Sequence, residues 1–577
     1  MTGHARHDIQ EVEARPTVQV FLPDGRVLEG PRGTRLAEFL AGESKELAPI
    51  VGGIVNGELR ELMIPVTMDA RVRPVRMNEA DGMRIYRRSL TFVLAAAFKQ
   101  LFPDAVLAVD HSVSSGGYYC EVHNREPLTP AELEKLQNAM QELVDADLPF
   151  EKTQMPVEEA IRYFQRSGHK DKALLLTHRK KPTLVMYRLG SYSDYHHGYM
   201  VPSTGYLQWF ALASANSGFT LQFPRRHRPV ELMGPPQYPK LLATFSQYGK
   251  WLSTLGVQDI GALNEAIAHG RARELVLVSE ALHEGRISEI ARTIAERKES
   301  VGVVLIAGPS SSGKTTFSKR LSIQLLTRGI SPFPLPMDDF FVDRAETPRD
   351  ENGDFDYESL HALDLERLDH DLRGLIAGDE VTLPHYNFKT GIQGQGRTVR
   401  LSREHVILLE GIHGLNPDLL HSISQDRTFR VYVSALTQLN LDRLNRVSTT
   451  DTRLLRRIVR DARYRGYSAR ETINRWESVR RGEKRYIFPF QENADVMFNS
   501  ALVYEGSALA PLAEPLIRQV PFGTPEHVEG KRLLAFLEWF IPIDKTLIPE
   551  NSILREFIGG SNLREFEPWH PPQPDDM

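Results

Sequence analysis

Alternation of apolar and polar residues is the first regular pattern in the chain, and it starts at Thr17. The stretch TVQVFLPDGRVLEG alternates on both sides of PDG, a sequence typical of hairpin turns. TRLAEFLAG predicts a short helix that ends near Gly42, and PIVGGIVNGEL and ARVRPVRM predict further strands. These elements predict a small β-grasp domain over residues 17–86, after a polar and disordered N-terminus over residues 1–16.

Helical spacing of apolar residues is the main pattern in the middle of the chain. It occurs in SLTFVLAAAFKQLF, LTPAELEKLQNAMQELVDADLPF and VEEAIRYFQRSG. The second of these segments has Thr129 at its N-cap and Glu132 three residues later, which predicts a capping box. ALLLTHR and PTLVMYRLG predict strands. PKLLATFSQYGKWLSTLG and the segment from Asn264 to Arg297 predict the helices of a linker over residues 226–298.

A continuous apolar run, VGVVLIAG, begins the last large region and predicts a buried parallel strand. A glycine-rich loop follows it directly, and KTTFSKRLSIQLLTRG predicts the next helix. Because strands and helices alternate from this point, we expect a doubly wound α/β domain over residues 299–505. The C-terminal extension, residues 506–577, contains the apolar run LLAFLEWFIPI, which should pack on this domain, and the tail EPWHPPQPDDM, which should be disordered.

Composition narrows the class of protein. The 577 residues allow several domains, and 70 basic against 75 acidic side chains give a net charge of −5. This balance provides no overall attraction to nucleic acid or membrane. The single cysteine, Cys120, excludes an intrachain disulfide, which fits a reducing compartment. The N-terminus has no apolar signal core, and the apolar runs are too short to span a membrane. We therefore expect a soluble cytoplasmic protein without membrane contact.

The loop GPSSSGKT matches the phosphate-loop pattern G-x-x-x-x-G-K-[ST]. Its glycines let successive backbone N–H groups turn toward phosphate oxygens, and the following helix adds its positive end. Lys314 should reach the β- and γ-phosphates of ATP, and the Thr315 hydroxyl should bind Mg²⁺. The residues predicted to bind ATP are Gly308, Ser310, Ser311, Ser312, Gly313, Lys314, Thr315 and Thr316.

Acidic residues end two other predicted strands. HVILLEGIHGL ends its apolar run in Glu410, a candidate magnesium ligand beside Thr315, although a solvated strand-end acid is the alternative. FPLPMDDFFVDR places Asp338 and Asp339 at the carboxyl end of a strand, where ligands bind in open α/β sheets. One of them could accept the proton of a substrate hydroxyl, and the alternative is a pair of turn-forming residues.

A basic helix is predicted for RLLRRIVRDARYRGYSARETINRW. Arginines recur in it at helical spacing, and they are Arg453, Arg456, Arg457, Arg460 and Arg463. A helix that closes over ATP phosphates would explain this run of positive charge, because arginines stabilise charge in phosphoryl transfer. The alternative is a helix that contacts RNA.

Taken together, GPSSSGKTTF, MDDFF, DFDY, LPHYNF, VILLEGIHGL, RRIVRDARYRG and ADVMFNSAL resemble, in order, the motifs of the uridine kinase/phosphoribulokinase family. This resemblance implies transfer of the ATP γ-phosphate to a sugar or nucleoside hydroxyl. It implies that Asp338 is the base, that Asp356 holds ribose hydroxyls and that Tyr386 lies beside the base pocket. The remaining residues that it implies are the magnesium acid Glu410, the acceptor-side Arg457 and the lid arginines Arg460 and Arg465.

Three positions depart from the uridine kinase pattern. Gly391 stands where such kinases carry a base-reading histidine, Tyr467 replaces a lid arginine and Arg475 replaces a glutamine. A site that loses hydrogen-bond partners for a base loses discrimination for that base. The pattern therefore predicts kinase chemistry more strongly than it predicts uridine.

The N-terminal part resembles threonyl-tRNA synthetase. VQVFLPDGRVLEG and IVNGEL resemble its TGS domain, and LAAAFKQLFPDAVLAV, LPFEKTQMPVEEAIRYF and YHHGYMVPSTGYL resemble its editing-type domain, here over residues 87–225. The four ligand positions of that domain are occupied by Arg88, Phe92, His196 and Met200, so catalytic editing is not expected. His196 and His197 could form a ligand pocket, or they could be surface or packing residues.

Two functions remain open on this evidence. The first is an ATP- and Mg²⁺-dependent kinase acting on a nucleoside or ribosyl acceptor, in which Asp338 is the base and Lys314, Arg460 and Arg465 neutralise charge. The second is a regulatory or RNA-binding ATPase that switches the synthetase-like half. The kinase is favoured by the presence of Asp338, Asp356 and Tyr386, because a nucleotide-dependent switch needs no residues that bind a phosphate acceptor. The resemblance also implies a homo-oligomer, with RNA contact through the N-terminal half as a further possibility.

Overall fold

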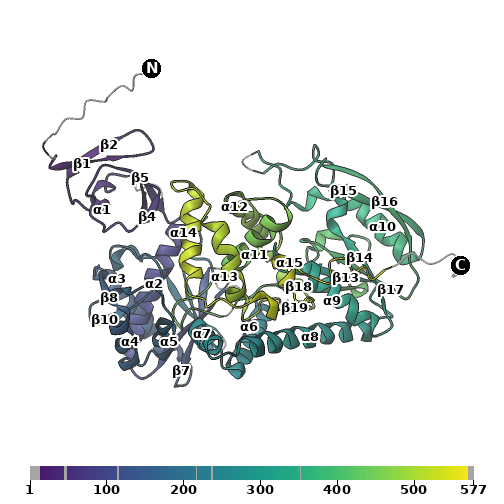
Figure 1. Ribbon diagram of the computed structural model, residues 1–577, viewed down its shortest axis with the longest axis horizontal. Helices are drawn as coiled ribbons and strands as arrows, with labels where there is room; N and C mark the ends of the chain where they lie inside the picture. The colour runs from purple at the N-terminus through teal and green to yellow at the C-terminus, as the bar shows by residue number, and fades with distance from the viewer. Residues whose placement is uncertain are drawn as a thin grey trace, which may run out of the picture.

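The computed structural model describes residues 13, 15–43, 48–113, 116–215, 217–234, 238–350, 353–437 and 439–569. Most of the N-terminus and the end of the tail that were predicted to be disordered lie outside these residues. Figure 1 shows the N-terminal half at one end of the molecule and the α/β domain at the other, with the C-terminal helices between them.

The first domain is a five-stranded sheet in the order β2-β1-β5-β3-β4. Its elements are β1 (Thr17–Phe21), β2 (Val27–Pro31), α1 (Leu36–Phe39), β3 (Ile50–Val55), β4 (Glu58–Arg60) and β5 (Ala70–Arg76). The hairpin predicted at PDG joins β1 and β2, and Gly25 in it has a φ of 87°. The first strand pairs in parallel with β5, which lies at the centre of the sheet. The β-grasp class predicted from alternation is confirmed.

The second domain is built around the long helix α2 (Ala80–Leu101). A four-stranded antiparallel sheet of β6 (Val106–Val113), β7 (Gly117–His123), β11 (Ala211–Ala215) and β12 (Gly218–Gln222) accompanies it. A three-stranded sheet consists of β8 (Glu151–Pro156), β9 (Thr183–Leu189) and β10 (Tyr192–Asp194). The helices are α3 (Pro130–Asp145), α4 (Val157–Arg166) and α5 (Lys170–Thr177). The capping box predicted for Thr129 and Glu132 begins α3.

One predicted strand in this domain is wrong. ALLLTHR lies within and just after helix α5, which buries Ala173, Leu175 and Leu176 in the main hydrophobic core. A short continuous apolar run fits a buried strand and a buried helix equally well, so its periodicity could not decide between them.

Three helices connect the two halves, and they are α6 (Pro239–Leu255), α7 (Ile260–Ala268) and α8 (Ala272–Glu296). The single helix predicted from Asn264 to Arg297 is interrupted at Gly270, whose φ of 79° lies in the left-handed region. Helix α8 runs along one side of the molecule (Figure 1). It is tied to the helix after the phosphate loop by Arg320, which binds the carboxylates of Glu280 and Glu284.

The α/β domain contains a five-stranded parallel sheet in the order β14-β17-β13-β18-β19. Its strands are β13 (Val303–Ala307), β14 (Ser331–Pro336), β17 (His405–Glu410), β18 (Thr428–Ser434) and β19 (Val496–Asn499). Its helices are α9 (Lys314–Leu326), α10 (Leu365–Ala377), α11 (Thr449–Tyr464) and α12 (Ala469–Tyr486). A hairpin of β15 (Glu380–Asn387) and β16 (Ile392–Arg400) stands apart from this sheet. The predicted parallel, doubly wound class is confirmed.

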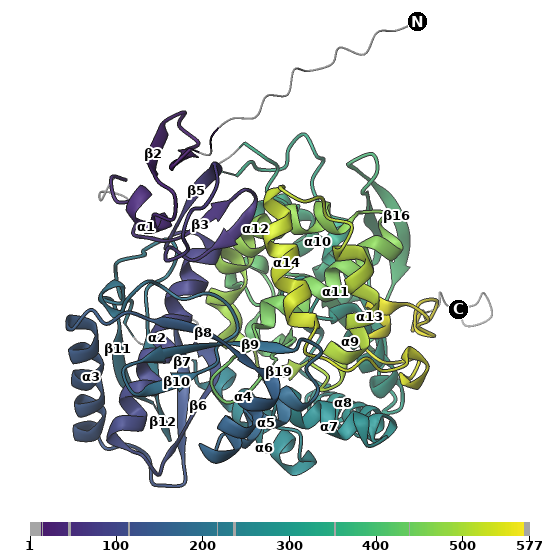
Figure 2. The ribbon, with the colours of Figure 1, turned by 60° about the vertical axis from the view of Figure 1, so that its left-hand side comes forward.

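The C-terminal extension forms α13 (Glu505–Ile517), α14 (Pro525–Leu537) and α15 (Arg555–Ile558). Figure 2 shows α14 next to the first domain. Ion pairs fix this position, because Glu529 of α14 binds Arg84 of α2 at 2.9 Å, and Arg532 of α14 binds Asp451 of α11 at 2.7 Å. The extension packs on the kinase-like region, as predicted, and it also contacts the N-terminal half.

Short 3-10 helices lie in the connections. They are η1 (Thr204–Tyr206), η2 (Met337–Phe340), η3 (Leu360–Ala362), η4 (Pro417–Leu419), η5 (Gln425–Arg427), η6 (Phe488–Asn493) and η7 (Lys545–Leu547). None of the helices in the described part of the chain combines the length and apolarity that a membrane span requires.

A buried ion cluster joins the two halves. The ammonium group of Lys172, on α5, lies 2.8 Å from Asp194 and 3.5 Å from Asp442, and all three side chains are almost fully buried. Burial opposes the charge of Lys172, but the two carboxylates outweigh it and raise the pKa of Lys172 above its usual value. Asp442 belongs to a loop of the α/β domain, so this cluster is an interdomain contact.

We expect Lys172→Met to destabilise the protein strongly, because it leaves two buried carboxylates without a cation. Removing one partner of a buried ion pair typically costs about 3–5 kcal/mol. Urea denaturation followed by circular dichroism measures the effect. Lys181→Met is the matched control, since Lys181 pairs with Glu538 at the exposed surface and should change stability by less than about 1 kcal/mol. Equal effects of the two substitutions would contradict the prediction.

Candidate functional site

The predicted phosphate loop connects β13 to α9 at the carboxyl edge of the parallel sheet. Its shape requires glycine at both ends. A Cβ on Gly308 would lie 1.9 Å from the carbonyl oxygen of Val433, and Gly313 has a φ of 87°. Ser311 between them also has a positive φ, of 59°, so the loop curls as a phosphate-binding loop must.

Thr315 and Glu410 lie together at the end of the loop. The Thr315 hydroxyl donates to Glu410 Oε1 at 3.0 Å, because Glu410 ends β17, the strand that pairs with β13. Burial raises the pKa of Glu410 to about 7, against the attraction of Lys314. A hydroxyl and a carboxylate are oxygen ligands that suit Mg²⁺, which takes few protein ligands and completes its shell with phosphates and water. The donor set therefore fits Mg²⁺.

The two acids of MDDFF differ in their surroundings. Asp339 Oδ1 makes a 2.9 Å hydrogen bond with His385 Nδ1, so it contacts the β15–β16 hairpin. Asp338 is exposed, and desolvation by the surrounding protein raises its pKa, although Lys314 attracts its charge. Of the two, Asp338 is therefore the one available to a substrate, and it lies within electrostatic reach of Lys314 and Arg465.

The residues assigned to the acceptor lie on separate elements. Asp356 accepts a hydrogen bond from the Tyr486 hydroxyl at 3.1 Å. Tyr386 is buried in an aromatic cluster, with its ring centroid 5.5 Å from that of Phe341. Arg457 donates to the Ser310 hydroxyl at 2.8 Å, so it reaches the phosphate loop itself.

The buried carboxylate of Asp461 lies near three arginines that were predicted to belong to the acceptor site or the lid. Asp461 lies 3.3 Å from Arg457 Nε, 2.8 Å from Arg460 Nη2 and 3.6 Å from Arg465 Nε. Burial and the neighbouring Arg460 lower the pKa of Arg465, because three cations share one anion. This arrangement holds a surplus of positive charge beside the phosphate loop.

Two other arginines of helix α11 do not lie on the ATP-facing surface that the sequence predicted for this helix. Arg456 is fully buried, binds Glu505 at 2.8 Å and donates to the Ser500 carbonyl oxygen at 2.8 Å. Arg453 is also buried and donates to Glu483 at 2.7 Å and to the Ser310 carbonyl oxygen at 3.1 Å. Their interpretation as part of a face that closes over ATP is wrong, because they support the loop from within the core.

Sequence reasoning missed two carboxylates that bind the phosphate loop. Glu483 accepts a hydrogen bond from the Ser310 N–H at 3.2 Å. Glu556, in α15, accepts from the N–H and the hydroxyl of Thr316 at 3.1 and 2.9 Å. Nothing local in the sequence marks Glu556, because 240 residues separate it from Thr316. It occupies donors in the first turn of α9 that a nucleotide phosphate would use.

A third missed residue is Glu358. Burial and repulsion from Glu483 raise its pKa to about 7, and it lies within electrostatic reach of Lys314 and Asp356. Its position two residues after Asp356, in DFDYE, was the available signal.

The four editing-type positions do lie close together, on α2 and the segment after β10. The rings of Phe92 and His196 are 5.2 Å apart, and Arg88 donates to the Tyr199 carbonyl oxygen at 2.7 Å. His196 is buried, and burial lowers its pKa to about 3, so it is a neutral packing residue. Among the described residues, no group of three or more histidine, cysteine or acidic side chains could hold a metal ion.

The two halves of the chain are similar to different known proteins. Residues 303–504 match the model of the Phosphoribulokinase / Uridine kinase family. The N-terminal part, about 200 residues, matches threonine--tRNA ligases. Identity is 34% over 199 residues with the Desulforamulus reducens protein and 36% over 197 residues with the Burkholderia lata protein, covering in each case 34% of this chain and 31% of the relative. The chain thus spans about a third of the length of these relatives.

Two solved structures are similar to about a third of the chain. A possible uridine kinase from Bacillus stearothermophilus is 25% identical with a TM-score of 0.25, over 37% of this chain and 97% of that one. A putative fructose transport system kinase from Silicibacter sp. TM1040 is 18% identical with a TM-score of 0.26, over 37% and 98%. The family match identifies residues 303–504 as a P-loop kinase region, and both resemblances inferred from the motifs are confirmed.

We expect Glu556→Ala to strengthen the binding of a nucleoside triphosphate by about tenfold, because it removes an anion that competes for the Thr316 donors. Titration with a fluorescent triphosphate analogue and Mg²⁺ measures the dissociation constant. The control is Glu550→Ala, which alters an exposed acid in the same C-terminal segment. An unchanged dissociation constant in Glu556→Ala would mean that Glu556 does not compete.

Proposed function

We propose that this protein is an ATP-dependent kinase that transfers the γ-phosphate to a hydroxyl group of a nucleoside or a related ribosyl molecule. The convergence of Thr315, Glu410, Lys314 and Asp338 at one edge of the parallel sheet carries the proposal. In the family model that matches residues 303–504, phosphoribulokinases and uridine kinases stand together, which supports this class of reaction.

The chemistry follows from the positions of these side chains. Asp338 takes the proton of the acceptor hydroxyl while that oxygen bonds to the γ-phosphorus and the bond to the ADP oxygen breaks. Its raised pKa makes it a better base than an ordinary aspartate. Lys314, Arg460 and Arg465 stabilise the charge on the phosphate oxygens. Mg²⁺, held by Thr315 and Glu410, supplies further charge neutralisation when bound.

The acceptor is proposed only as a ribosyl compound, because the base-reading positions are altered. Gly391 has a φ of 75°, and a Cβ there would lie 2.7 Å from the guanidinium of Arg344, so a histidine would be strained there and would displace Arg344. Arg475 stacks on the ring of Tyr467 at 4.3 Å, which engages both remaining positions with each other. Asp356, which accepts a hydrogen bond from the Tyr486 hydroxyl, is the carboxylate proposed to bind ribose hydroxyls.

The alternative is a nucleotide-dependent switch or RNA-binding ATPase that uses the synthetase-like half. The ion pairs that α14 makes with α2 and α11 favour some communication between the halves. A switch would hydrolyse ATP without a small acceptor and would respond to tRNA.

The test is ADP release from ATP and Mg²⁺ against nucleosides, ribose phosphates and pantothenate-like alcohols. We expect one acceptor to stimulate turnover, Lys314→Ala to abolish it and Asp338→Asn to slow it by about 100-fold or more while ATP still binds. Asp339→Asn is the matched control. Turnover stimulated by tRNA and by no small acceptor would replace the proposal with the alternative.

The Mg²⁺ requirement should depend on pH through Glu410. Its carboxyl group is protonated below about pH 7 in the free protein, and only the carboxylate binds the metal. We expect the Mg²⁺ concentration for half-maximal turnover to rise about tenfold between pH 8 and pH 6. In Glu410→Gln it should be higher throughout and follow only the titration of ATP. Identical pH profiles for the two proteins would exclude Glu410 as the ligand.

A further inference from the structure

A cavity of about 750 Å³ lies between the two halves, and Pro309, near the start of the phosphate loop, is part of its lining. Its volume is within the range of roughly 300–1,000 Å³ that small-molecule sites occupy. Helices α2, α12 and α14, the segment 195–199 and the loop before α11 contribute to its wall. Lys314, Thr315, Asp338 and Glu410 are not among the described residues that line it, so it is distinct from the proposed kinase site.

Positive charge dominates the cavity. Its lining includes 13 arginine and lysine side chains and only three acidic ones, Glu58, Asp81 and Asp451. Six of the basic side chains pair with carboxylates, for example Arg84 with Glu529 and Arg532 with Asp451. The basic residues of the lining that have no carboxylate partner among the described residues are Arg87, Arg88, Arg179, Arg225, Arg446, Arg480 and Lys484.

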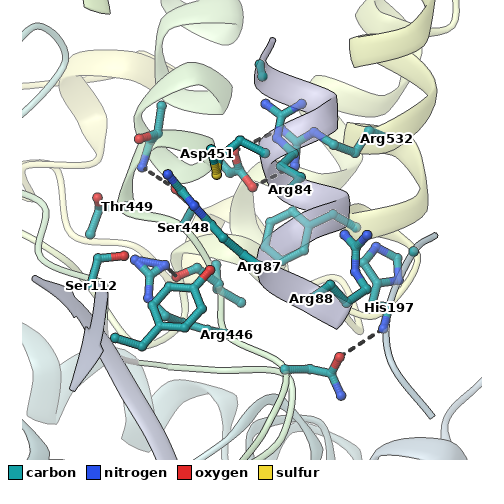
Figure 3. Close-up of a pocket in the computed structure, with 18 of the residues that line it drawn as sticks. Arg84, Arg87, Arg88, Ser112, His197, Arg446, Ser448, Thr449, Asp451 and Arg532 are labelled. Atoms are coloured by element: carbon teal, nitrogen blue, oxygen red, sulfur yellow. Dashed lines mark hydrogen bonds and ion pairs between the residues drawn. The ribbon is translucent and has the colours of Figure 1, made fainter. Parts of the chain in front are cut away.

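Figure 3 shows Arg87 and Arg88 of α2, Arg446 of the loop before α11 and Arg532 of α14 around the same space. The Nε atoms of Arg87 and Arg446 are buried and have no hydrogen-bond partner among the described residues. Arg446 lies over the ring of Tyr118 at 5.5 Å, and Arg87 lies over the ring of Phe223 at 4.7 Å. Aromatic packing thus holds both guanidinium groups in place and leaves their Nε donors free, while Arg446 Nη1 donates to the Val447 carbonyl oxygen at 2.8 Å.

The cations repel one another in this space. Burial and the nearby Arg480 and Arg446 lower the pKa of Arg87 to about 10. Burial and the same kind of repulsion, from Arg480, Arg226 and Arg87, lower the pKa of Lys484 to about 8. Such crowding costs free energy in the free protein, and a bound anion would relieve it.

Hydroxyl groups and a helix end complete the wall. Ser448, Thr449 and Thr450 begin helix α11 and line the cavity, and Ser112 lies on another part of the wall (Figure 3). The 16-residue helix α11 directs its positive end toward the same space. Tyrosine and phenylalanine rings, including Tyr118, Tyr187 and Phe223, supply apolar surface for an organic group.

We propose that this cavity binds a small organic phosphate, with Arg87, Arg446 and Arg480 holding the phosphate group and the aromatic residues holding the organic part. Two guanidinium groups with free donors suit phosphate, which arginine binds through paired hydrogen bonds. We favour a small molecule over an RNA strand, because the volume of about 750 Å³ lies in the range of small-molecule sites and residues of both halves line it. The proposal does not depend on the kinase activity.

The test uses the full-length protein with Lys314→Ala, so that the phosphate loop contributes little binding. Isothermal titration calorimetry with pyrophosphate and with AMP should show saturable binding at one site. Arg87→Gln and Arg446→Gln should each weaken it by about tenfold or more. Arg292→Gln, an exposed arginine of α8 that pairs with Glu296, is the matched control and should leave binding unchanged.

Thermal unfolding of each variant identifies loss of fold, and Arg480→Gln tests the same site from a different helix if either variant is unstable. Absence of saturable binding of both probes would overturn the proposal. So would equal weakening by Arg292→Gln. Tight binding of a single-stranded RNA that pyrophosphate does not displace would assign the cavity to nucleic acid and also overturn it.

Discussion

The buried ammonium group of Lys172 is the constraint on which the arrangement of the two halves depends. It comes from a helix of the synthetase-like half, and one of its two carboxylate partners, Asp442, comes from a loop of the kinase-like region. The same loop is held by Arg443, which binds Asp171 at 2.7 Å, and by Asn440, which donates to backbone oxygens of β6. These buried contacts cross between the halves, so the two halves pack together as one folded unit.

The phosphate loop is held in a ligand-ready shape by side chains around it. Arg453 and Arg456 fix it from the core through carbonyl oxygens and through their own buried partners Glu483 and Glu505. Glu483 and Glu556 bind its N–H groups, which are donors that a buried loop cannot leave unpaired. The two carboxylates therefore stabilise the loop when no ligand is bound. Each would compete with an entering phosphate for the same hydrogen-bond donors.

The sequence predicted those site residues that belong to short contiguous motifs. Lys314, Thr315 and Glu410 follow from a loop motif and a strand end, and the parallel sheet brings them together as expected. Glu556 and the cavity arginines could not be predicted, because their positions depend on contacts between segments far apart in the chain. Helix α11 shows the limit most directly. Its arginines look equivalent in the sequence, yet Arg456 is fully buried against Glu505, whereas Arg457 donates to the Ser310 hydroxyl of the phosphate loop. The packing of α13 and α15 against α11 distinguishes them.

The contacts between the halves can form only after the kinase-like region has been synthesised. Asp171 and its partner Arg443 are 272 residues apart, so a ribosome adding about 5–20 residues per second needs roughly 15–50 s to supply the second after the first. During that interval the nascent N-terminal half carries Lys172 without Asp442, and the apolar surface that the kinase-like region later covers is exposed. Such a segment is a natural client for a chaperone. Helices α14 and α15, which are made after the kinase-like region, add Glu529 to the contact with α2 and Glu556 to the contact with the phosphate loop.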